Sequence, residues 1–179
     1  MVVSAGIRGR LTAALIVLVA SMPAISGSVA FAAESLPQPA TPPILVVDGN
    51  IAATNRGKTA AFDLALLKTL PQTTLKTMTA WTEGESSFTG VRLRDLLDRL
   101  GAQGKTLTAA AVDDYRTDIP MADVRDYDVM VVYAMDGKPL PPDNKGPLWI
   151  LYPFSQNPAL QRDVYFARCV WQLNRLTVR

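Results

Sequence analysis

The stretch LKTMTAW, residues 75–81, combines hydroxyl groups and an indole ring at a regular spacing. Its strict alternation predicts a strand in which Leu75, Thr77, Thr79 and Trp81 share one face. A face with two hydroxyls and an indole suits a pocket that binds a small polar or heterocyclic molecule. Threonine is also a good strand former and tryptophan a common packing residue, so the structural interpretation stays open beside the binding one.

The absence of histidine narrows the chemistry of the chain. Without imidazole, Ser-His-Asp and Cys-His catalysis and histidine-based zinc sites are excluded. The sequence also lacks the motifs G-x-S-x-G, C-x-x-C and S-x-x-K and any glycine-rich phosphate loop. The ordinary hydrolase mechanisms are therefore excluded, and no catalytic residue is assigned.

Cys169 is the single cysteine of the chain, so no internal disulfide can form. It lies in the apolar stretch RCVWQL, where a free cysteine usually behaves as a small buried hydrophobe. We therefore expect neither a reactive thiol nor a disulfide-linked partner.

Acidic residues crowd the segment 113–128, which contains Asp113, Asp114, Asp118, Asp123, Asp126 and Asp128. A calcium loop needs a glycine at its bend and a closing glutamate, and this segment has neither. The basic residues with loop-like surroundings are Arg116, Lys145, Arg162 and Arg168. Each could bind an anion, but solvated surface charge is the simpler interpretation, and no metal site is predicted.

The first 32 residues have the features of a secretory signal peptide. Arg8 and Arg10 precede the apolar run 11–20, and the small-x-small pattern at 30–32 predicts cleavage near Ala32. The protein is therefore expected to be periplasmic or secreted. Residues 33–43 are rich in proline and predict an extended, poorly packed leader, and residues 44–179 form the predicted domain.

Removal of residues 1–32 from the 179-residue chain leaves 147 residues, enough for one domain with a core. The chain has 18 Lys and Arg against 16 Asp and Glu, and the loss of Arg8 and Arg10 makes the remainder formally neutral. A nucleic-acid partner is excluded because the basic footprint that it requires is missing.

Hydrophobic periodicity predicts helices at 60–70 and 88–102, with a further helical turn at 121–127. The second of these has a leucine stripe and ends at Gly101. Strands are predicted at 44–49, 73–81, 106–112, 129–135, 147–154 and 169–178, with a hairpin turn at Asp136-Gly137. The fold class that follows is α+β, with mixed sheets and flanking helices.

An ordered set of segments resembles the molybdopterin-binding domain of the sulfite oxidase family. The set runs LKTMTAW, FTGVRLRDLLDRLGA, AVDDYRTDIPM, YAMDGKPLP, GPLWILYPF and VWQLNRLTV, and it spans residues 44–179. The resemblance implies the family fold, a pterin pocket and molybdopterin as a cofactor. In this family a protein cysteine thiolate, together with the pterin dithiolene, holds molybdenum, a metal that suits soft sulfur ligands.

Matched through Ala80-Trp81, the position of the family's cysteine falls on Thr77, and its polar neighbour falls on Thr79. The resemblance therefore implies that Thr77, Thr79, Trp81 and Tyr115 line the pocket, with no thiolate ligand for the metal. A threonine hydroxyl is a hard ligand that stays protonated near neutral pH and cannot replace a thiolate.

Three functions remain open. The first is an exported, non-catalytic or degenerate ligand-binding module derived from a molybdopterin oxidoreductase. The alternative is a molybdopterin-dependent oxidoreductase whose metal is coordinated without cysteine, so the sequence leaves enzymatic activity undecided. The third is a structural partner of a membrane or periplasmic protein, recognised through a sheet edge.

Overall fold

The computed structural model describes residues 1–2 and 36–179, so the predicted signal peptide lies almost wholly outside the described residues. No helix among the described residues is long and apolar enough to span a membrane.

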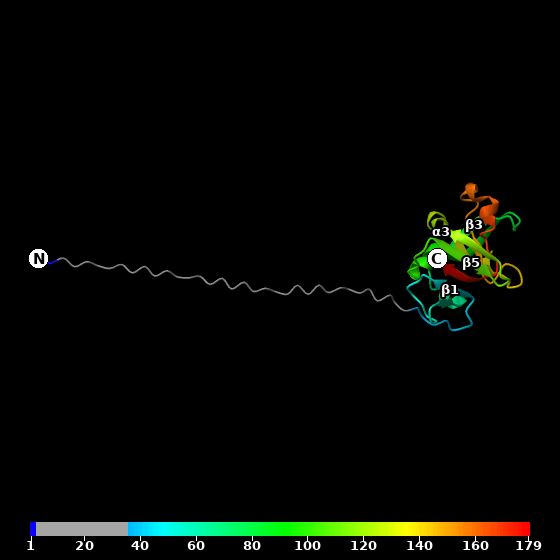
Figure 1. Ribbon diagram of the computed structural model, residues 1–179. Coiled ribbons are helices and arrows are strands. Elements are labelled where there is room, and N and C mark those ends of the chain that lie inside the picture. Colours follow the sequence, from blue (N-terminus) through cyan, green and yellow to red (C-terminus); the bar gives the residue numbers. More distant parts are fainter. Residues whose placement is uncertain (3–35) are drawn as a thin grey trace. The chain divides into compact units, whose positions relative to one another are not determined.

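Residues 36–179 form two sheets with short helices (Figure 1). The strands are β1 Leu45–Gly49, β2 Ala60–Phe62, β3 Gln72–Met78, β4 Glu85–Arg92, β5 Thr106–Ala111, β6 Arg116–Pro120, β7 Met130–Met135, β8 Lys138–Pro139, β9 Trp149–Leu151 and β10 Leu173–Val178. The helices are α1 Leu64–Leu67, α2 Leu93–Arg99, α3 Met121–Asp126 and α4 Asp163–Phe166, with a 3-10 turn η1 at Pro158–Leu160.

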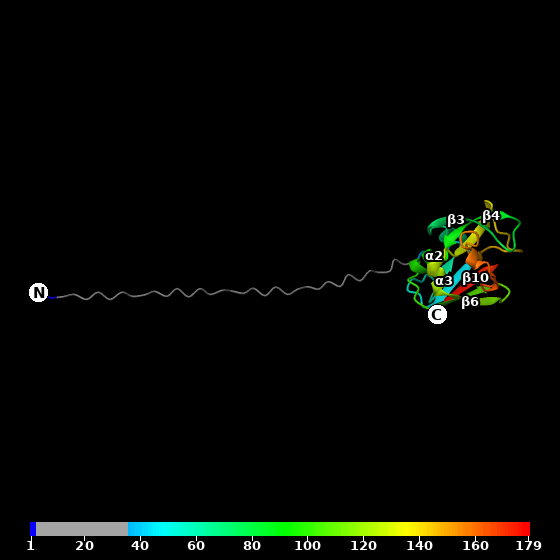
Figure 2. The same ribbon diagram turned by 90° about the horizontal axis from the view of Figure 1, so that it is seen from above.

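The first sheet has the order β2-β1-β10-β5-β6 and is mixed, because β1 and β10 run parallel while the other pairs are antiparallel. The second sheet is antiparallel, with β3, β4 and β7 in order and both β8 and β9 paired to β7. In Figure 2, β3 and β4 lie on one side of the domain and β6 and β10 on the other. The predicted α+β class with mixed sheets and flanking helices is confirmed.

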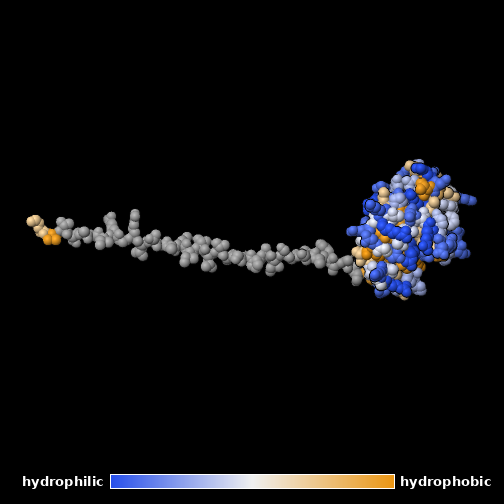
Figure 3. Space-filling view, in the orientation of Figure 1, coloured by the Kyte–Doolittle hydropathy of each residue, from blue (hydrophilic) through white to orange (hydrophobic). Residues whose placement is uncertain are grey.

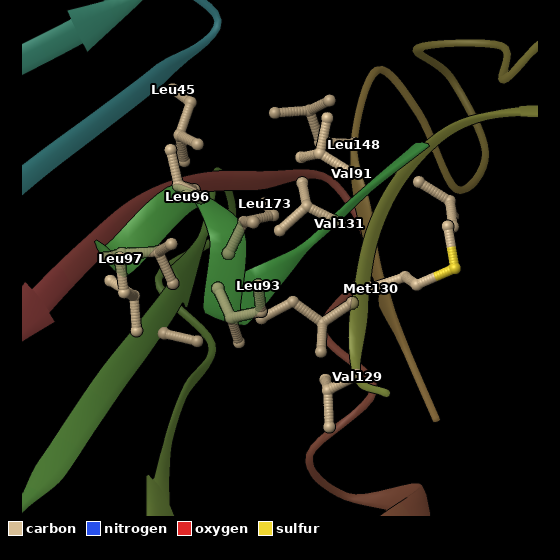
Figure 4. Packing of buried hydrophobic residues seen from close by; sticks show 14 of the residues in the cluster. Leu45, Val91, Leu93, Leu96, Leu97, Val129, Met130, Val131, Leu148 and Leu173 are labelled. Carbon is tan, nitrogen blue, oxygen red and sulfur yellow. The ribbon is translucent and has the colours of Figure 1, made fainter. Parts of the chain in front are cut away.

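The leucine stripe of α2 links the two sheets. Leu93, Leu96 and Leu97 are buried, and Figure 4 shows them in one cluster with Leu45 of the first sheet and Val131 of the second. Burial of each such side chain stabilises the fold by about 1.5–3 kcal/mol. The helix ends as predicted, because Gly101 has φ +59° and its N–H donates to the carbonyl of Asp98.

Two predicted helices are shorter than the sequence pattern indicates. Residues 60–70 form β2 and then α1, because Asp63 caps the helix by accepting the N–H of Leu66 at 2.8 Å. Residues 88–92 belong to β4, where Gly90 packs so closely on Val131 that a Cβ would lie 2.2 Å from its carbonyl oxygen. Tertiary packing therefore overrides the helical spacing in both segments.

The described part of the proline-rich leader, residues 36–43, is mostly exposed, and a few contacts hold it to the domain. Leu36 is buried, and the side-chain amide of Asn55 donates to the carbonyl of Pro37 at 2.7 Å. Further along, the carboxylate of Asp63 accepts the N–H of Thr41 at 2.9 Å. Proline removes donors but leaves carbonyls free, so polar side chains of the domain can hold such a segment.

The solvent-facing surface of residues 36–179 is mostly hydrophilic in the view of Figure 3, with small separate apolar patches.

Candidate functional site

Thr77 lies near the end of β3 and is fully buried. Its hydroxyl accepts the N–H of Ser155 at 2.9 Å and lies 3.0 Å from the carbonyl of Met78 and 3.3 Å from the hydroxyl of Ser155. The Ser155 hydroxyl in turn accepts the N–H of Met78 at 2.8 Å. The side chain of Thr77 therefore points inward as predicted. Its hydroxyl contacts the loop after β9, and Thr77 lines neither of the cavities described below.

Thr79 and Trp81 lie beyond β3, in the turn that leads to β4, so the predicted strand ends earlier than residue 81. The hydroxyl of Thr79 accepts the N–H of Trp81 at 3.1 Å and lies 2.9 Å from the hydroxyl of Thr82. This local bonding fixes the turn and thereby the position of the indole ring.

The ring of Trp81 packs edge-on against three other aromatic rings. Its centroid lies 5.7 Å from that of Trp149, 5.8 Å from that of Phe166 and 5.6 Å from that of Trp171. Such edge-to-face contacts add about 0.5–1.5 kcal/mol each beyond area burial. We call Trp81, Phe166 and Trp171 the aromatic wall.

A cavity of about 360 Å³ lies on one side of the aromatic wall, beside Thr79. Its lining consists of Met78, Thr79, Ala80, Phe154, Gln161 and Phe166. Most of these side chains are apolar, and Thr79 and Gln161 supply the polar groups. We call it the Thr79 cavity.

A second cavity, of about 220 Å³, contains Tyr115 and also reaches Phe166. Its lining consists of Ala111, Asp113, Tyr115, Asn144, Phe166, Ala167, Cys169, Val170, Trp171 and Gln172. The hydroxyl of Tyr115 donates to the carbonyl of Ala167 at 2.7 Å, which fixes the ring at the cavity. We call it the Tyr115 cavity.

The predicted site residues thus distribute around the wall without forming one pocket. Thr79 lines one cavity, Tyr115 lines the other, Trp81 contacts Phe166 and Trp171, and Thr77 lies behind in the core. Phe166 belongs to both linings and was missed by the sequence analysis, because the segment around α4 has no strong periodicity. The aromatic side chain of Phe166 was the only feature of the sequence that could have suggested a place in a binding pocket.

Two indole N–H groups of the aromatic cluster lack a hydrogen-bond partner within the described part of the chain. They are Nε1 of Trp149 and Nε1 of Trp171, and both atoms are buried. Trp171 lines the Tyr115 cavity. A buried donor without an acceptor is costly, so these two N–H groups reduce the stability of this region.

Cys169 borders the Tyr115 cavity but is buried, with 6% of its surface exposed. Burial raises the pKa of its thiol to about 12, and the sulfur lies 3.4 Å from the carbonyl of Tyr165. A protonated thiol is a poor nucleophile and a poor metal ligand, which agrees with the predicted packing role.

The basic side chains near the wall already have partners. Arg168 donates to the carboxylate of Asp123 at 2.7 Å, and that carboxylate also accepts the hydroxyl of the buried Tyr152 at 2.8 Å. The ammonium of Lys145 lies 4.7 Å from the ring centroid of Trp171. Neither residue belongs to the lining of either cavity.

Comparison with solved structures supports the fold. The domain is similar to the sulfane dehydrogenase SoxCD from Paracoccus pantotrophus, with a TM-score of 0.56 and 21% sequence identity. The match covers 75% of this chain and 37% of the SoxCD chain, so it spans well under half of that larger protein. This likeness concerns the fold alone.

The comparison with curated proteins gave no match. The family model described as the oxidoreductase molybdopterin binding domain matches residues 51–178, which include every strand of the domain except β1. The matched residues make up most of the chain and agree with the sulfite-oxidase-type fold described above. The chain therefore belongs to the family of oxidoreductase molybdopterin-binding domains.

Proposed function

We propose that this chain is an exported, non-catalytic member of its family that binds a small polar or heterocyclic molecule at the aromatic wall. The observation that carries this proposal is the state of Thr77. The position that resemblance assigns to the metal-ligating cysteine holds a buried hydroxyl that is bonded to Ser155.

The remaining residues fit a thiolate-bound molybdenum centre poorly. Thr77 supplies no thiolate, and Cys169 is kept protonated by burial. Within the described residues, no group of three or more His, Cys, Asp or Glu side chains is placed to hold a metal ion. The protein groups that would bind molybdenum through sulfur are therefore lacking at this position.

The phosphate of a molybdopterin also lacks an evident partner. A phosphate is usually held by Arg, Lys or a set of backbone N–H groups. The linings of the Thr79 and Tyr115 cavities contain no Arg or Lys among the described residues, and Asp113 adds a negative charge to the latter. A neutral or weakly charged ligand agrees better with these linings.

The rings of Phe166 and Trp171 in the cavity linings favour a flat ligand. Tyr115, Asn144 and Gln172 provide polar groups around the Tyr115 cavity. Aromatic walls with a few placed polar groups are typical of small-molecule sites.

Metal and pterin analysis tests the non-catalytic part of the proposal. The full sequence is expressed in a host that makes and exports the molybdenum cofactor, and the purified protein is analysed for molybdenum and for oxidised pterin fluorescence. We expect neither. Thr77→Cys places a thiol at the position that resemblance assigns to the metal ligand, and Thr79→Cys, two residues further on, is its matched control. Molybdenum retained by Thr77→Cys alone would mean that the missing thiolate is what prevents metal binding.

A melting screen tests the ligand-binding part. A metabolite panel of neutral heterocycles is added to the same protein, and a true ligand at a hundred times its Kd adds about 2.7 kcal/mol to the free energy of unfolding. Gln172→Ala, at the rim of the Tyr115 cavity, should reduce the shift. A screen without any shift would refute the ligand-binding part.

A molybdopterin-dependent oxidoreductase without cysteine coordination is the second candidate, because the family match covers most of the chain. Stoichiometric molybdenum in the unaltered protein would establish this candidate and overturn the first.

The export of the protein and its partners are part of the same proposal. Residues 1–32 act as the signal peptide, cleavage near Ala32 releases the domain into the periplasm or medium, and mass spectrometry of the mature N-terminus tests this. If no ligand shifts the melt, capture of a membrane or periplasmic protein supports a structural role instead. The formally neutral charge of residues 33–179 argues against a nucleic-acid partner, and the burial of Cys169 argues against a disulfide-linked partner.

A further inference from the structure

The outer edge of β6 presents unpaired backbone groups. At its two ends, the carbonyl of Tyr115 accepts the N–H of Ala111, and the N–H of Met121 donates to the carbonyl of Lys105. In an antiparallel strand the backbone N–H and C=O groups of successive residues point alternately to one edge and the other. The backbone groups of Thr117 therefore point toward β5, as those of Tyr115 and Met121 do. The N–H and C=O groups of Arg116 and Asp118 therefore point away from the sheet, toward solvent.

Two other edges of the sheets are covered by side chains from the domain itself. The amide of Asn55 both accepts the N–H of Ala61 at 2.7 Å and donates to its carbonyl at 2.9 Å, which closes the edge of β2. On β3, Ser155 accepts the N–H of Met78 and Gln156 donates to the carbonyl of Lys76 at 2.7 Å. Among the described residues, no hydrogen bond of this kind engages the outward groups of Arg116 and Asp118.

We infer that β6 pairs with β6 of a second copy of this chain, antiparallel and about a two-fold axis at Thr117. In this register Arg116 lies directly opposite Asp118 of the second copy. On the other side of the axis, Asp118 lies opposite Arg116 of the second copy. Each of these pairs exchanges both of its N–H···O=C bonds, because both residues direct their backbone groups outward. The edge is therefore complementary to itself.

The side chains agree with the same register. Arg116 and Asp118 are both exposed and lie on one face of the strand. The intramolecular contact of Arg116, with Asp114, is long at 3.6 Å and solvent-exposed, so the guanidinium is available to a closer carboxylate. Asp118 is held on this face by the hydroxyl of Thr108, which donates to it at 2.6 Å. Opposite charges directly across a strand pair are stabilising, and like charges are destabilising.

The contact is short. The next residues to pair on each side would be Asp114 of one copy and Pro120 of the other. Pro120 has no N–H to donate, and the N–H of Asp114 donates to the carbonyl of Ala111, so pairing is limited to the two pairs of Arg116 with Asp118. A short edge contact belongs to the weak class of interfaces. We therefore expect a dimer Kd roughly in the micromolar to millimolar range, so that the fraction of dimer rises with protein concentration.

Charge exchange combined with sedimentation equilibrium tests the register. The protein expressed from the full sequence should change from monomer toward dimer as its concentration rises. Arg116→Asp places Asp opposite Asp118, and Asp118→Arg places Arg opposite Arg116. Each single variant should raise the dimer Kd at least about tenfold. A mixture of the two variants should form a heterodimer, because both cross-strand pairs are then of opposite charge.

Glu83→Arg is the matched control, since it makes the same charge change as Asp118→Arg at an exposed turn beside the other sheet. It should leave the dimer Kd unchanged. A protein that stays monomeric at millimolar concentration overturns the inference. A dimer that survives both single variants also overturns it, as does a mixture that fails to associate.

Discussion

The Ser155 N–H donates to the buried hydroxyl of Thr77 at 2.9 Å, although the two residues are 78 positions apart in the chain. This contact and the bond from the N–H of Met78 to the Ser155 hydroxyl at 2.8 Å join β3 to the loop that follows β9. The pair thus occupies the place where resemblance to catalytic relatives would put a metal ligand.

The Thr77–Ser155 pair should show energetic coupling. Thr77→Val leaves the N–H of Ser155 without its acceptor, which costs about 1–3 kcal/mol of unfolding free energy. Ser155→Ala keeps the backbone N–H but removes the hydroxyl that lies 3.3 Å from that of Thr77, so a double-mutant cycle of these two variants measures the contact between the two hydroxyls. Urea unfolding should give a coupling of about 0.5–3 kcal/mol. Thr74→Val, at an exposed position of the same strand, should change stability by less than about 0.5 kcal/mol. Additive effects of the two variants would contradict a contact between the two hydroxyls.

Loss of the partly buried ion pair between Arg168 and Asp123 should destabilise the fold more than loss of the neighbouring Tyr152 hydroxyl. Arg168→Met leaves a buried carboxylate without its counter-ion and should cost about 3–5 kcal/mol. Tyr152→Phe removes one neutral donor and should cost about 1–3 kcal/mol. Arg94→Met, which breaks the solvent-exposed pair with Asp128, should cost about 0–1 kcal/mol and serves as the control. An equal loss in the first two variants would contradict this order.

Asp63 should make stability fall in acid. The N–H of Leu66, and after it that of Thr41, stabilises the carboxylate and lowers its pKa. The ionised Asp63 carboxylate contributes its full share of the unfolding free energy above the unfolded pKa of about 4. This share is lost as the pH falls through the lower folded pKa. Asp63→Asn should therefore destabilise the protein near neutral pH and reduce the slope of unfolding free energy against pH below about pH 4. An unchanged slope in Asp63→Asn would assign the acid sensitivity to other carboxylates.

Cys169 should make stability fall in base. Its folded pKa of about 12 lies above that of an exposed thiol, so the unfolded state loses its proton first as the pH rises. The protonated, buried thiol contributes fully below about pH 8.5 and progressively less up to the folded pKa. Cys169→Ala should flatten this decline between about pH 9 and pH 11, as measured by urea unfolding. A thiol reagent at neutral pH should modify Cys169 only after denaturation, and rapid modification of the folded protein would contradict its burial.

Local signals in the sequence predicted the elements that depend on local interactions. The stripe of α2 and the turn at Asp136-Gly137 were predicted and are confirmed, and both turn residues have positive φ, 50° and 76°. Residues 60–62 and 88–92 were predicted wrongly as helical, because pairing with β1 and β7 fixes them as strands. Such pairing depends on partners distant in the chain and leaves no local signature.

The environment of the candidate site residues depends on the same non-local contacts. Alternation in LKTMTAW predicted the inward face of Thr77, but it did not predict that β3 ends at Met78 and turns Thr79 toward a different surface. Phe166 and Trp171 reach Trp81 from segments that are far away in the sequence. The distribution of the predicted residues over two cavities was therefore not predictable from one strand pattern.

The chain has three tryptophans, and all of them meet in one cluster, with ring centroids 5.6 to 6.2 Å apart. At such separations the excited states of neighbouring indoles can couple and exchange energy. Emission excited at the red edge of the indole absorption, where tyrosine does not absorb, therefore reports on this cluster. A molecule that entered either neighbouring cavity would change that signal without any added label.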